Sequence, residues 1–349
     1  MIIYFVHGSV SPDIMSPGRQ VKSILYLRQM QRLTLLLAVF FIGTPTSFAQ
    51  LRWKKINAEF GYLPKSINVY RTTDSMEGKP NIAYYIEAKL KDRNLEFTTQ
   101  VGNGSRFTPT KFYEMEDSPY VLVNGTFFSF ETNQNLNTVI KKGKMVAYNV
   151  PALKSKNSDS FYYPTRSALG ISRKREADVA WLFTDTAQRW PYAFQSKPVI
   201  AKGKTSDPVF EDLNTLDYWK WWRMQTAIGG GPVLLQKGKI RITSKEEQMF
   251  TGGENDKHPR TAMGYTKKGK LIILVIQGRF PGIAEGATLQ QEAKILKALR
   301  CVEALNLDGG GSSCLLVNGK ETIKPSDKDG QRAVPAVFII RSKKIMNIY

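Results

Sequence analysis

The chain has 349 residues, a formal net charge of +20, a hydrophobic fraction of 42% and two cysteines, Cys301 and Cys314. Two cysteines exclude a disulfide framework and leave open one disulfide or two buried thiols. His258 is the one histidine beyond residue 49, which excludes a multi-histidine metal site, so we expect no metal and no cofactor. The positive charge suits an anionic partner. However, many lysines fall in short turns and no arginine-rich helix is present, so we expect no nucleic-acid partner.

The first 49 residues differ in character from the rest. The segment 30–49 has the layout of a secretory signal peptide cleaved after Ala49: the basic Arg32, an apolar run at 33–43 and a small-residue site ending at Ala49. The apolar run is too short to span a bilayer, which makes a membrane-anchored N-terminus the weaker alternative. We expect residues 1–49 to be an extension and signal peptide. The protein would then be exported, either periplasmic or secreted, without a stable membrane anchor, and its oligomeric state stays open.

The remaining chain consists of a strand-rich N-terminal part at 50–120 and a domain at 121–349. Short β-branched or aromatic runs, bounded by Gly, Pro, Asn or Lys, are typical of strands. These runs lie at 67–73, 82–90, 120–128, 167–172, 179–184, 232–243, 261–276, 304–307, 314–320 and 336–341.

Helical patterns are fewer. The segment 108–116 has Pro109 in its first turn, where proline is tolerated. The segment 288–300 begins with Thr288 and Gln291 at the spacing of a capping box and continues with an apolar stripe of helical period. The sequence therefore predicts an α+β fold with a mixed, mostly antiparallel sheet and few helices.

The segment 261–307 predicts where a ligand would bind. Its first two strands are joined by a short turn and are therefore antiparallel. A strand, the helix at 288–300 and a further strand then form a C-terminal β-α-β crossover, normally right-handed with parallel strands. Ligands in such sheets bind beyond the carboxyl ends of the strands, so Arg279 and Glu285 should meet Asp308 at one rim.

Other polar groups should gather at the same rim. They are His258, Arg260, the glycine turn Gly309, Gly310 and Gly311, the following Ser312 and Ser313, and the N-terminus of the predicted helix. Backbone N–H groups of a glycine turn and of a helix N-terminus suit an anion, and arginines bind phosphate bidentately. Two carboxylates are what glycosidic cleavage usually requires. The rim therefore predicts an anionic, phosphorylated sugar or glycan as substrate.

Five ordered blocks, VNGTFF (123–128), GGGPVLL (229–235), HPRTAMGY (258–265), 277–293 and ALNLDGGGSSCLLVNGK (304–320), carry a resemblance to a known family. The chain resembles the phosphodiester glycosidase family, which includes the lysosomal uncovering enzyme, in a bacterial-type exported form. The resemblance implies hydrolysis of a sugar-1-phosphodiester to a phosphomonoester and a free sugar. The functional residues that it implies are Asn124, Arg260, Thr261, Arg279, Glu285, Asp308 and Gly309 to Ser313.

Three positions depart from the family pattern. Thr126 replaces the second glycine of an N-G-G-F-F block, Gln277 replaces the acid of a D-G-R block, and Cys314 stands where a threonine is usual. If the acid at position 277 were catalytic, this chain would be impaired or altered in its substrate.

Each site residue has a structural alternative. Asp308 is interpreted as a catalytic carboxylate rather than a turn residue, whereas Glu285 is equally well a catalytic or a solvated loop carboxylate. His258 is either a functional residue, as a general acid or as a hydrogen-bond donor to phosphate, or a structural histidine. We expect Arg260 and Arg279 to hold phosphate rather than only to form ion pairs.

The other site residues are predicted to bind substrate. Asn124 would contact a sugar hydroxyl, and Ser312 and Ser313 would donate hydrogen bonds. Thr261 is a substrate-binding residue that the family resemblance implies. The predicted function is hydrolysis of a glycosyl phosphodiester. One alternative is a secreted, non-catalytic binding protein for phosphorylated or acidic glycans, which the missing acid at Gln277 favours. Another is an exopolysaccharide-related protein that acts through its basic surface.

Overall fold

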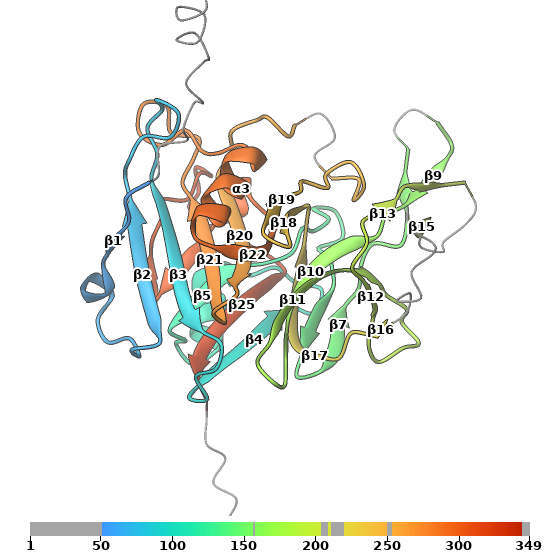
Figure 1. Cartoon of the computed structure of the whole chain (residues 1–349), viewed down its shortest axis with the longest axis horizontal. Helices are drawn as coiled ribbons and strands as arrows, with labels where there is room; N and C mark the ends of the chain where they lie inside the picture. Colours follow the sequence, from blue (N-terminus) through green and yellow to red (C-terminus); the bar gives the residue numbers. More distant parts are fainter. Residues whose placement is uncertain (1–50, 156–157, 204–208, 211–219, 250–252, 344–349) are drawn as a thin grey trace, which may run out of the picture. The chain divides into compact units, whose positions relative to one another are not determined.

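A computed structural model describes residues 51–155, 158–203, 209–210, 220–249 and 253–343 (Figure 1). The predicted signal peptide lies outside the described residues. No helix within these ranges is long and apolar enough to cross a membrane. The described chain is built mostly of antiparallel strands with two α-helices, which confirms the predicted α+β class.

The largest sheet has eight strands. In spatial order these are β1 (Lys54–Lys55), β2 (Ile67–Thr72), β3 (Ala83–Lys89), β21 (Lys270–Ile276), β20 (Arg260–Thr266), β22 (Cys301–Asn306), β18 (Val233–Gln236) and β19 (Lys239–Ile240). β21 and β22 both pair antiparallel with β20, which lies between them, so these two strands run parallel to each other. Their carboxyl ends therefore lie at the same edge of the sheet.

Two further sheets complete most of the fold. The five-stranded sheet has the order β24 (Lys320–Glu321), β23 (Leu315–Val317), β5 (Val121–Asn124), β25 (Ala336–Ser342) and β4 (Leu95–Val101). The seven-stranded sheet has the order β16 (Lys220–Trp221), β12 (Tyr192–Phe194), β11 (Ala177–Phe183), β10 (Arg166–Ser172), β17 (Met224–Gly230), β6 (Val139–Lys141) and β7 (Lys144–Ala147).

Small elements occupy the remaining connections. They are β8 (Leu153–Lys154), β9 (Phe161–Tyr163), β14 (Ala201–Lys202), β13 (Pro198–Val199), β15 (Val209–Phe210) and the 3₁₀ turns η1 (Asn57–Phe60) and η2 (Gly310–Ser312). Three lysine-rich segments of the sequence, 141–144, 236–239 and 267–270, are the tips of the hairpins β6–β7, β18–β19 and β20–β21, as their short loops predict.

One apolar core joins the three large sheets. It contains Ile86 of β3, Leu169 of β10, Ile273 of β21 and Phe338 of β25, all fully buried. The N-terminal part at 50–120 shares this core, because β1–β3 extend the eight-stranded sheet and β4 pairs with β25.

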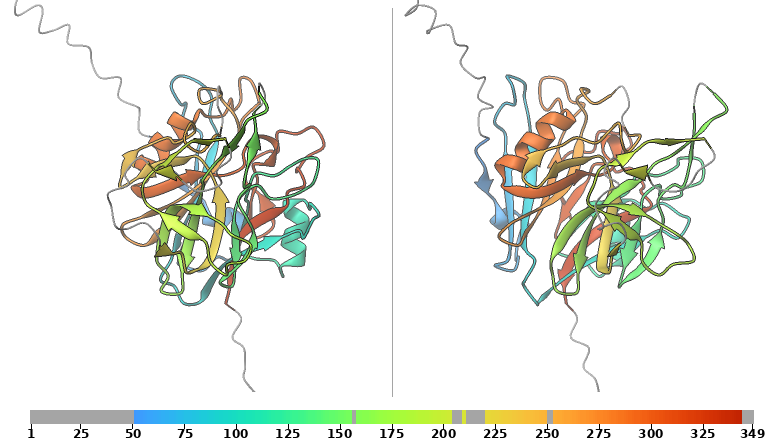
Figure 2. Two further views of the ribbon diagram at one scale, coloured as in Figure 1. Left: turned by 90° about the vertical axis from the view of Figure 1, so that its right-hand side faces the viewer. Right: turned by 45° about the vertical axis from the view of Figure 1, so that its right-hand side comes forward.

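Both predicted helices form where their caps indicate. Helix α2 (Pro109–Met115) begins after Thr108, whose hydroxyl accepts the N–H of Lys111. Helix α3 (Leu289–Ala298) connects β21 to β22 and contacts β18, β20 and β22, so that it covers one face of the eight-stranded sheet (Figure 2). Both bonds of its capping box, between Thr288 and Gln291, are present.

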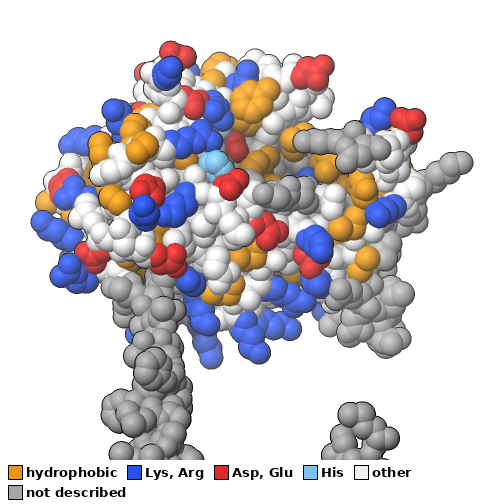
Figure 3. Space-filling view, turned by 90° about the horizontal axis from the view of Figure 1, so that it is seen from above, with side chains coloured by type: hydrophobic (Ala, Val, Ile, Leu, Met, Phe, Trp, Pro, Cys, Tyr) orange, Lys and Arg blue, Asp and Glu red, His pale blue; other side chains and the backbone are white. Residues whose placement is uncertain are grey.

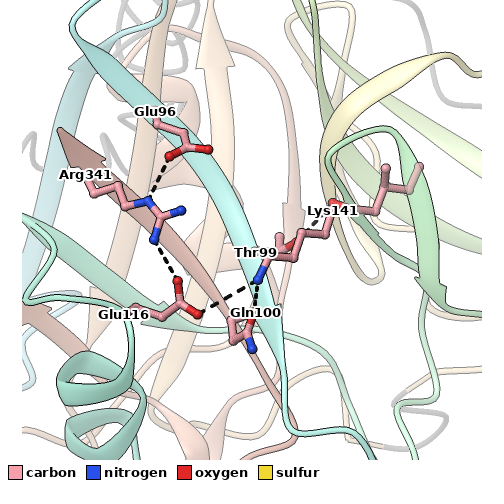
Figure 4. Close-up of polar contacts among 7 residues, drawn as sticks. Glu96, Thr99, Gln100, Glu116, Lys141 and Arg341 are labelled. Carbon is pink, nitrogen blue, oxygen red and sulfur yellow. Dashed lines mark hydrogen bonds and ion pairs between the residues drawn. The ribbon is translucent and has the colours of Figure 1, made fainter. Parts of the chain in front are cut away.

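Ionic side chains fasten β4, β25 and β6 together. Arg341 of β25 donates to Glu96 of β4 and to Glu116 at the end of α2, each at 2.8 Å (Figure 4). Lys141 of β6 reaches the other oxygen of Glu116 at 3.9 Å and also bonds to Gln100. The five- and seven-stranded sheets are thus linked by charges that satisfy one another. We call Glu96, Gln100, Glu116, Lys141 and Arg341 the inter-sheet network.

Candidate active site

Asp308 lies immediately beyond β22, at the sheet edge where the sequence places it. Its N–H donates to the carbonyl of Gly125 at 3.0 Å, which fixes the loop after β5 beside it. The residue keeps part of its surface accessible. Burial raises the pKa of the Asp308 carboxyl to about 7, and the nearby Ser312 side chain and the positive charge of Arg332 partly offset this effect. Such a carboxyl can take up or release a proton near neutral pH.

A buried hydrogen-bond network holds Asp308 in place. The side-chain amide of Asn124 donates to the Asp308 carbonyl at 2.6 Å. The amide oxygen of Asn124 accepts from the Thr261 hydroxyl and from the Cys314 N–H, both at 3.0 Å, and Thr261 also lies 3.2 Å from the Ser313 hydroxyl. Asn124 and Thr261 have no exposed surface, and Ser313 has 2%. These predicted substrate-binding residues are therefore brought together, beneath the rim, where they position Asp308.

The glycine turn after Asp308 is shaped by the side chains that lie on it. Gly310 has a φ of +61°, and a Cβ on it would lie 2.9 Å from Nη2 of Arg279. A Cβ on Gly311 would overlap the side chains of Asp327 and Arg332. Glycine suits position 310 because of its left-handed φ, and at position 311 any side chain would displace the Asp327 and Arg332 side chains.

Few N–H groups remain open at the predicted anion site. The N–H of Gly310 donates to the Pro259 carbonyl at 2.9 Å, and those of Ser312 and Ser313 donate within the turn. The α3 N-terminus is likewise closed by its own capping box. An anion at this turn would therefore meet the guanidinium of Arg279, because most of the backbone N–H groups already donate to other carbonyls.

Arg279 supplies that guanidinium. It follows β21, is exposed, and has a φ of +66°, so the chain turns sharply at this residue. Among the residues that the structure describes, its side chain has no hydrogen bond and no ion pair. The charge of Arg279 is therefore uncompensated by other side chains of the described residues, and it lies against Gly310, in the turn that follows Asp308.

Arg260 lies at the same edge but points inward. It is 1% exposed, and its guanidinium donates to the carbonyls of Ala287 and Asp256, each at 2.8 Å. The buried Glu292 of α3 lies within its electrostatic reach, and burial followed by this opposing charge sets the pKa of Glu292 at about 8. In this conformation Arg260 holds the loops around the rim together, whereas Arg279 is the arginine that a ligand can reach.

Glu285 is committed to two lysines. Its carboxylate oxygens lie 3.2 Å from Nζ of Lys257 and 3.8 Å from Nζ of Lys79. These contacts join the loop after β21 to the loop before β20 and to the segment that follows β2. Two carboxylates were predicted to be catalytic, Glu285 and Asp308. Among the described residues, Asp308 has no ion pair with a lysine, whereas Glu285 has two.

His258 completes the rim through its backbone and its ring. It pairs with Ala287 in an isolated bridge, and within the described ranges its buried Nδ1 has no hydrogen-bond partner. Burial, and then the charges of Arg260 and Arg279, lower the pKa of His258, so the ring is neutral at neutral pH. Viewed from above, a histidine side chain lies at the surface beside acidic and apolar groups, with basic side chains around the periphery (Figure 3).

Sequence reasoning missed Arg332 and Asp327. Arg332 donates to both carboxylate oxygens of Asp327, at 2.8 and 3.0 Å, and the pair lies over Gly311. The positive charge of Arg332 also opposes the rise in the pKa of the Asp308 carboxyl that burial causes. Both residues belong to a polar stretch at 326–332 that reads as an ordinary turn, so no local pattern distinguishes them.

The three departures from the family pattern are structurally accommodated. Gln277 is 7% exposed and its amide oxygen accepts the N–H of Lys324 at 2.8 Å, a bond that a carboxylate could also accept. The hydroxyl of Thr126 bonds to the Asn135 side chain. Cys314 is buried and free, as is Cys301, so the two cysteines are thiols. In the described part of the chain no three His, Cys, Asp or Glu side chains are grouped to hold a metal ion.

Comparisons with known proteins show what the chain is similar to. The family model for phosphodiester glycosidases matches residues 117–341. The N-acetylglucosamine-1-phosphodiester alpha-N-acetylglucosaminidase of Bos taurus is 35% identical over 103 residues, which are 27% of this chain and 19% of that protein. The chain thus spans about a fifth of the length of this curated relative.

Two solved structures share the fold. A hypothetical protein from Synechocystis superposes with a TM-score of 0.57 and 14% identity over 84% of this chain and 64% of its own. The catalytic domain of the zebrafish N-acetylglucosamine-1-phosphodiester alpha-N-acetylglucosaminidase, auto-inhibited by its pro-peptide, superposes with a TM-score of 0.52 and 21% identity over 84% of this chain and 89% of its own. At these identities the likeness concerns the fold.

Proposed function

Because the chain belongs to the phosphodiester glycosidase family, we propose that it hydrolyses a sugar-1-phosphodiester, with Arg279 binding the phosphate and Asp308 acting on the attacking water. One observation carries the proposal. The uncompensated guanidinium of Arg279 lies on the glycine turn that begins at Asp308, whose carboxyl has a pKa of about 7. A hydrogen-bond donor for phosphate and a carboxyl group that titrates near neutral pH therefore lie close to each other.

The chemistry of the substrate explains why one free carboxylate is sufficient. In this reaction the bond between C1 of the sugar and the bridging oxygen breaks, and the phosphomonoester leaves with the electron pair. A phosphomonoester is a weak base, so it departs without a strong general acid. Arg279 would stabilise the charge that develops on it. The ionised Asp308 would accept a proton from water as the water oxygen bonds to C1.

The surrounding residues would keep these two groups in position. Asn124, Thr261 and Ser313 fix the backbone of Asp308 from below. Arg260 ties the loop before β20 to the start of α3 through the Ala287 carbonyl. The neutral ring of His258 would serve as a hydrogen-bond partner of the substrate. Glu285 keeps its loop in place through Lys79 and Lys257.

A second candidate function is a binding protein that holds a phosphorylated glycan without cleaving it. Two observations favour it: Glu285 is engaged by lysines, and Gln277 stands at the position of an acid. The rim would then use Arg279 in the same way, and Asp308 would contribute hydrogen bonds instead of base catalysis.

The signal-peptide pattern at 30–49 supports a further proposal, that the protein is exported. Detection of a mature N-terminus at Gln50 in the exported fraction would support it. Retention of residues 1–49 on the cytoplasmic protein would contradict it.

The deciding experiment is hydrolysis of a panel of sugar-1-phosphodiesters, beginning with the methyl diester of N-acetylglucosamine-1-phosphate. Wild type is compared with Asp308→Asn and Arg279→Ala, with circular dichroism to check folding. Turnover that is lost in Asp308→Asn supports catalysis. Absence of turnover by the wild type, together with diester binding that requires Arg279 but not Asp308, would leave the binding protein as the function.

A further inference from the structure

An exposed aromatic ring lies beside the rim, between two guanidinium groups. Phe130 is 64% exposed. Its ring centroid lies 5.6 Å from Cζ of Arg106 and 5.4 Å from Cζ of Arg332. Arg332 also lies over Gly311, and its positive charge opposes the rise in the pKa of the Asp308 carboxyl. The ring and its two arginines therefore adjoin the candidate active site. We call Arg106, Phe130 and Arg332 the arginine–phenylalanine shelf.

The loop that carries Phe130 is fixed by buried side chains. Asn137 accepts the N–H of Phe127 at 3.2 Å and donates to the Gly230 carbonyl at 2.8 Å. Phe128 is 7% exposed and its ring lies 4.7 Å from that of Phe130. The exposed ring is therefore supported from beneath, so a ligand would meet a preformed surface.

The two arginines of the shelf differ in charge balance. Arg332 is bound bidentately by Asp327. Arg106 lies 5.2 Å from the Phe128 centroid and, among the described residues, has no hydrogen bond or ion pair. A guanidinium held against ring faces keeps its N–H groups available at its edge, and those groups match a carboxylate or phosphate. The shelf thus has one uncompensated positive charge beyond Arg279.

We propose that the shelf binds a negatively charged substituent on the aglycone, the part of the substrate on the far side of the phosphate from the released sugar. This rests on the proposed function, since it assumes that Arg279 holds the cleaved diester. Arg279 lies against Gly310, whereas Arg332 lies against the adjacent Gly311 and also contacts the Phe130 ring. The shelf is therefore one step further along the turn than Arg279, so we assign the second anion to the next unit of the ligand. The substrate class is a glycan or glycerol chain with a further acidic group after the diester.

The test compares three diesters of N-acetylglucosamine-1-phosphate, whose aglycones are methyl, glycerol and glycerol 3-phosphate. Wild type is compared with Arg106→Gln, which removes the charge, and Phe130→Leu, which removes the ring. Arg223→Gln is the matched control, because Arg223 also stacks on an aromatic ring, that of Trp190 at 5.2 Å, in the segment before β17. Circular dichroism and thermal unfolding check the fold of each variant.

We expect the wild-type KM for the glycerol 3-phosphate diester to be about tenfold lower than for the glycerol diester, the gain expected from one charge-assisted contact. Arg106→Gln should abolish that preference, with kcat changed far less than KM, and Arg223→Gln should retain it. Equal KM values for the charged and uncharged aglycones in the wild type would overturn the proposal. A preference that depends on Phe130 but not Arg106 would also overturn it, because it would indicate stacking of a neutral group.

A binding measurement separates this inference from the proposed function. If no diester is hydrolysed, the proposed reaction fails. Calorimetric titration with non-hydrolysable phosphonate analogues of the glycerol and glycerol 3-phosphate diesters then tests the shelf alone. Tighter binding of the charged analogue that is lost in Arg106→Gln supports the shelf. Equal affinity of the two analogues overturns it.

Discussion

The inter-sheet network and the rim use arginine in opposite ways. In the network, Arg341 bonds to Glu96 and Glu116, and Lys141 compensates the remaining charge of Glu116 (Figure 4). At the rim, Arg279 is exposed and the described chain offers its side chain neither a carboxylate nor a hydrogen bond. The first arrangement is complete without a ligand, and the second is not.

The difference separates charges that hold the fold from charges that recognise a ligand. An ion pair between strands is arranged so that each side chain satisfies the other, and removing one partner leaves the other unpaired and partly buried. An exposed guanidinium on a rigid turn contributes little to folding, but it is ready to pair with an incoming phosphate. Mutations in the two regions should therefore act on different quantities.

The largest effect is expected for Arg279→Ala. It should lower kcat/KM for a sugar-1-phosphodiester by about 10²–10³-fold, because one preorganised donor to the developing phosphate charge is lost. The melting temperature should stay within about 1 °C of wild type, as expected for an exposed side chain without partners. Steady-state kinetics and thermal unfolding provide the two values. Arg279→Lys should recover only part of the loss, because lysine cannot bind bidentately; a large fall in stability would place Arg279 with the structural arginines.

The reverse outcome is expected for Arg341→Ala. Glu116 has an 11% exposed side chain and would lose its closest partner, so the free energy of unfolding should fall by about 2 kcal/mol. For a domain of this size the melting temperature would fall by roughly 4–8 °C. Activity per folded molecule, measured well below that temperature, should remain within about twofold of wild type. Double substitution of Arg341 and Glu116 by Met and Leu should recover part of the stability, because the partly buried Glu116 carboxylate is then no longer left without its closest partner, whereas Glu96 and Lys141 still lose one partner each.

Sequence patterns identified many of the longer strands and both α-helices, and they led us to expect three loops at one sheet edge. Strand ends and chain direction determine which loops share an edge, so Asp308, Arg279 and His258 could be expected together before any coordinates. What the patterns could not determine is where each side chain points. Arg260 and Arg279 have the same chemistry in the sequence, yet one is 1% exposed and the other lies on the surface.

Side chains that act through long-range contacts also escaped prediction. Arg332 reaches Gly311 from a polar turn, and Phe130 stacks on arginines from two distant segments. Strand β4 lies in a run that mixes polar and apolar residues and was not predicted, although it pairs with β25 along its length. Each of these depends on partners more than twenty positions away, whose approach depends on the packing of the sheets.

The pH dependence of Asp308 gives a smaller, directional test of the same comparison. Activity that uses the ionised carboxylate should rise with pH and reach half its maximum near pH 7, the pKa of Asp308. Stability should change in the opposite direction. Between its unfolded pKa, 3.8, and about 7 the folded protein binds the extra proton, so this group's contribution to stability falls as pH rises through that window.

Asp308→Asn isolates that contribution, since other carboxyls with raised pKa values, Asp178 at about 6 and Glu292 at about 8, remain in both proteins. The difference in unfolding free energy between variant and wild type should move in favour of the variant from pH 5 to pH 8. Chemical denaturation at several pH values measures it. A difference that stays constant with pH would mean that Asp308 does not titrate near neutrality.

The smallest effect is expected for Gln277→Asp, which restores the acid of the family pattern. Gln277 lies two residues before Arg279, is 7% exposed, and accepts the Lys324 N–H through its amide oxygen. An aspartate is one methylene shorter and would hold the same loop less closely, so we expect kcat/KM to change by less than about threefold. Gln277→Glu, which keeps the length, is the matched control, and both are assayed on the methyl diester. A gain of about tenfold or more in either variant would show that the rim lacks a second working carboxylate. The contrast between paired and unpaired arginines would then describe how the substrate is held, and the rate would depend on an acid that this chain has replaced.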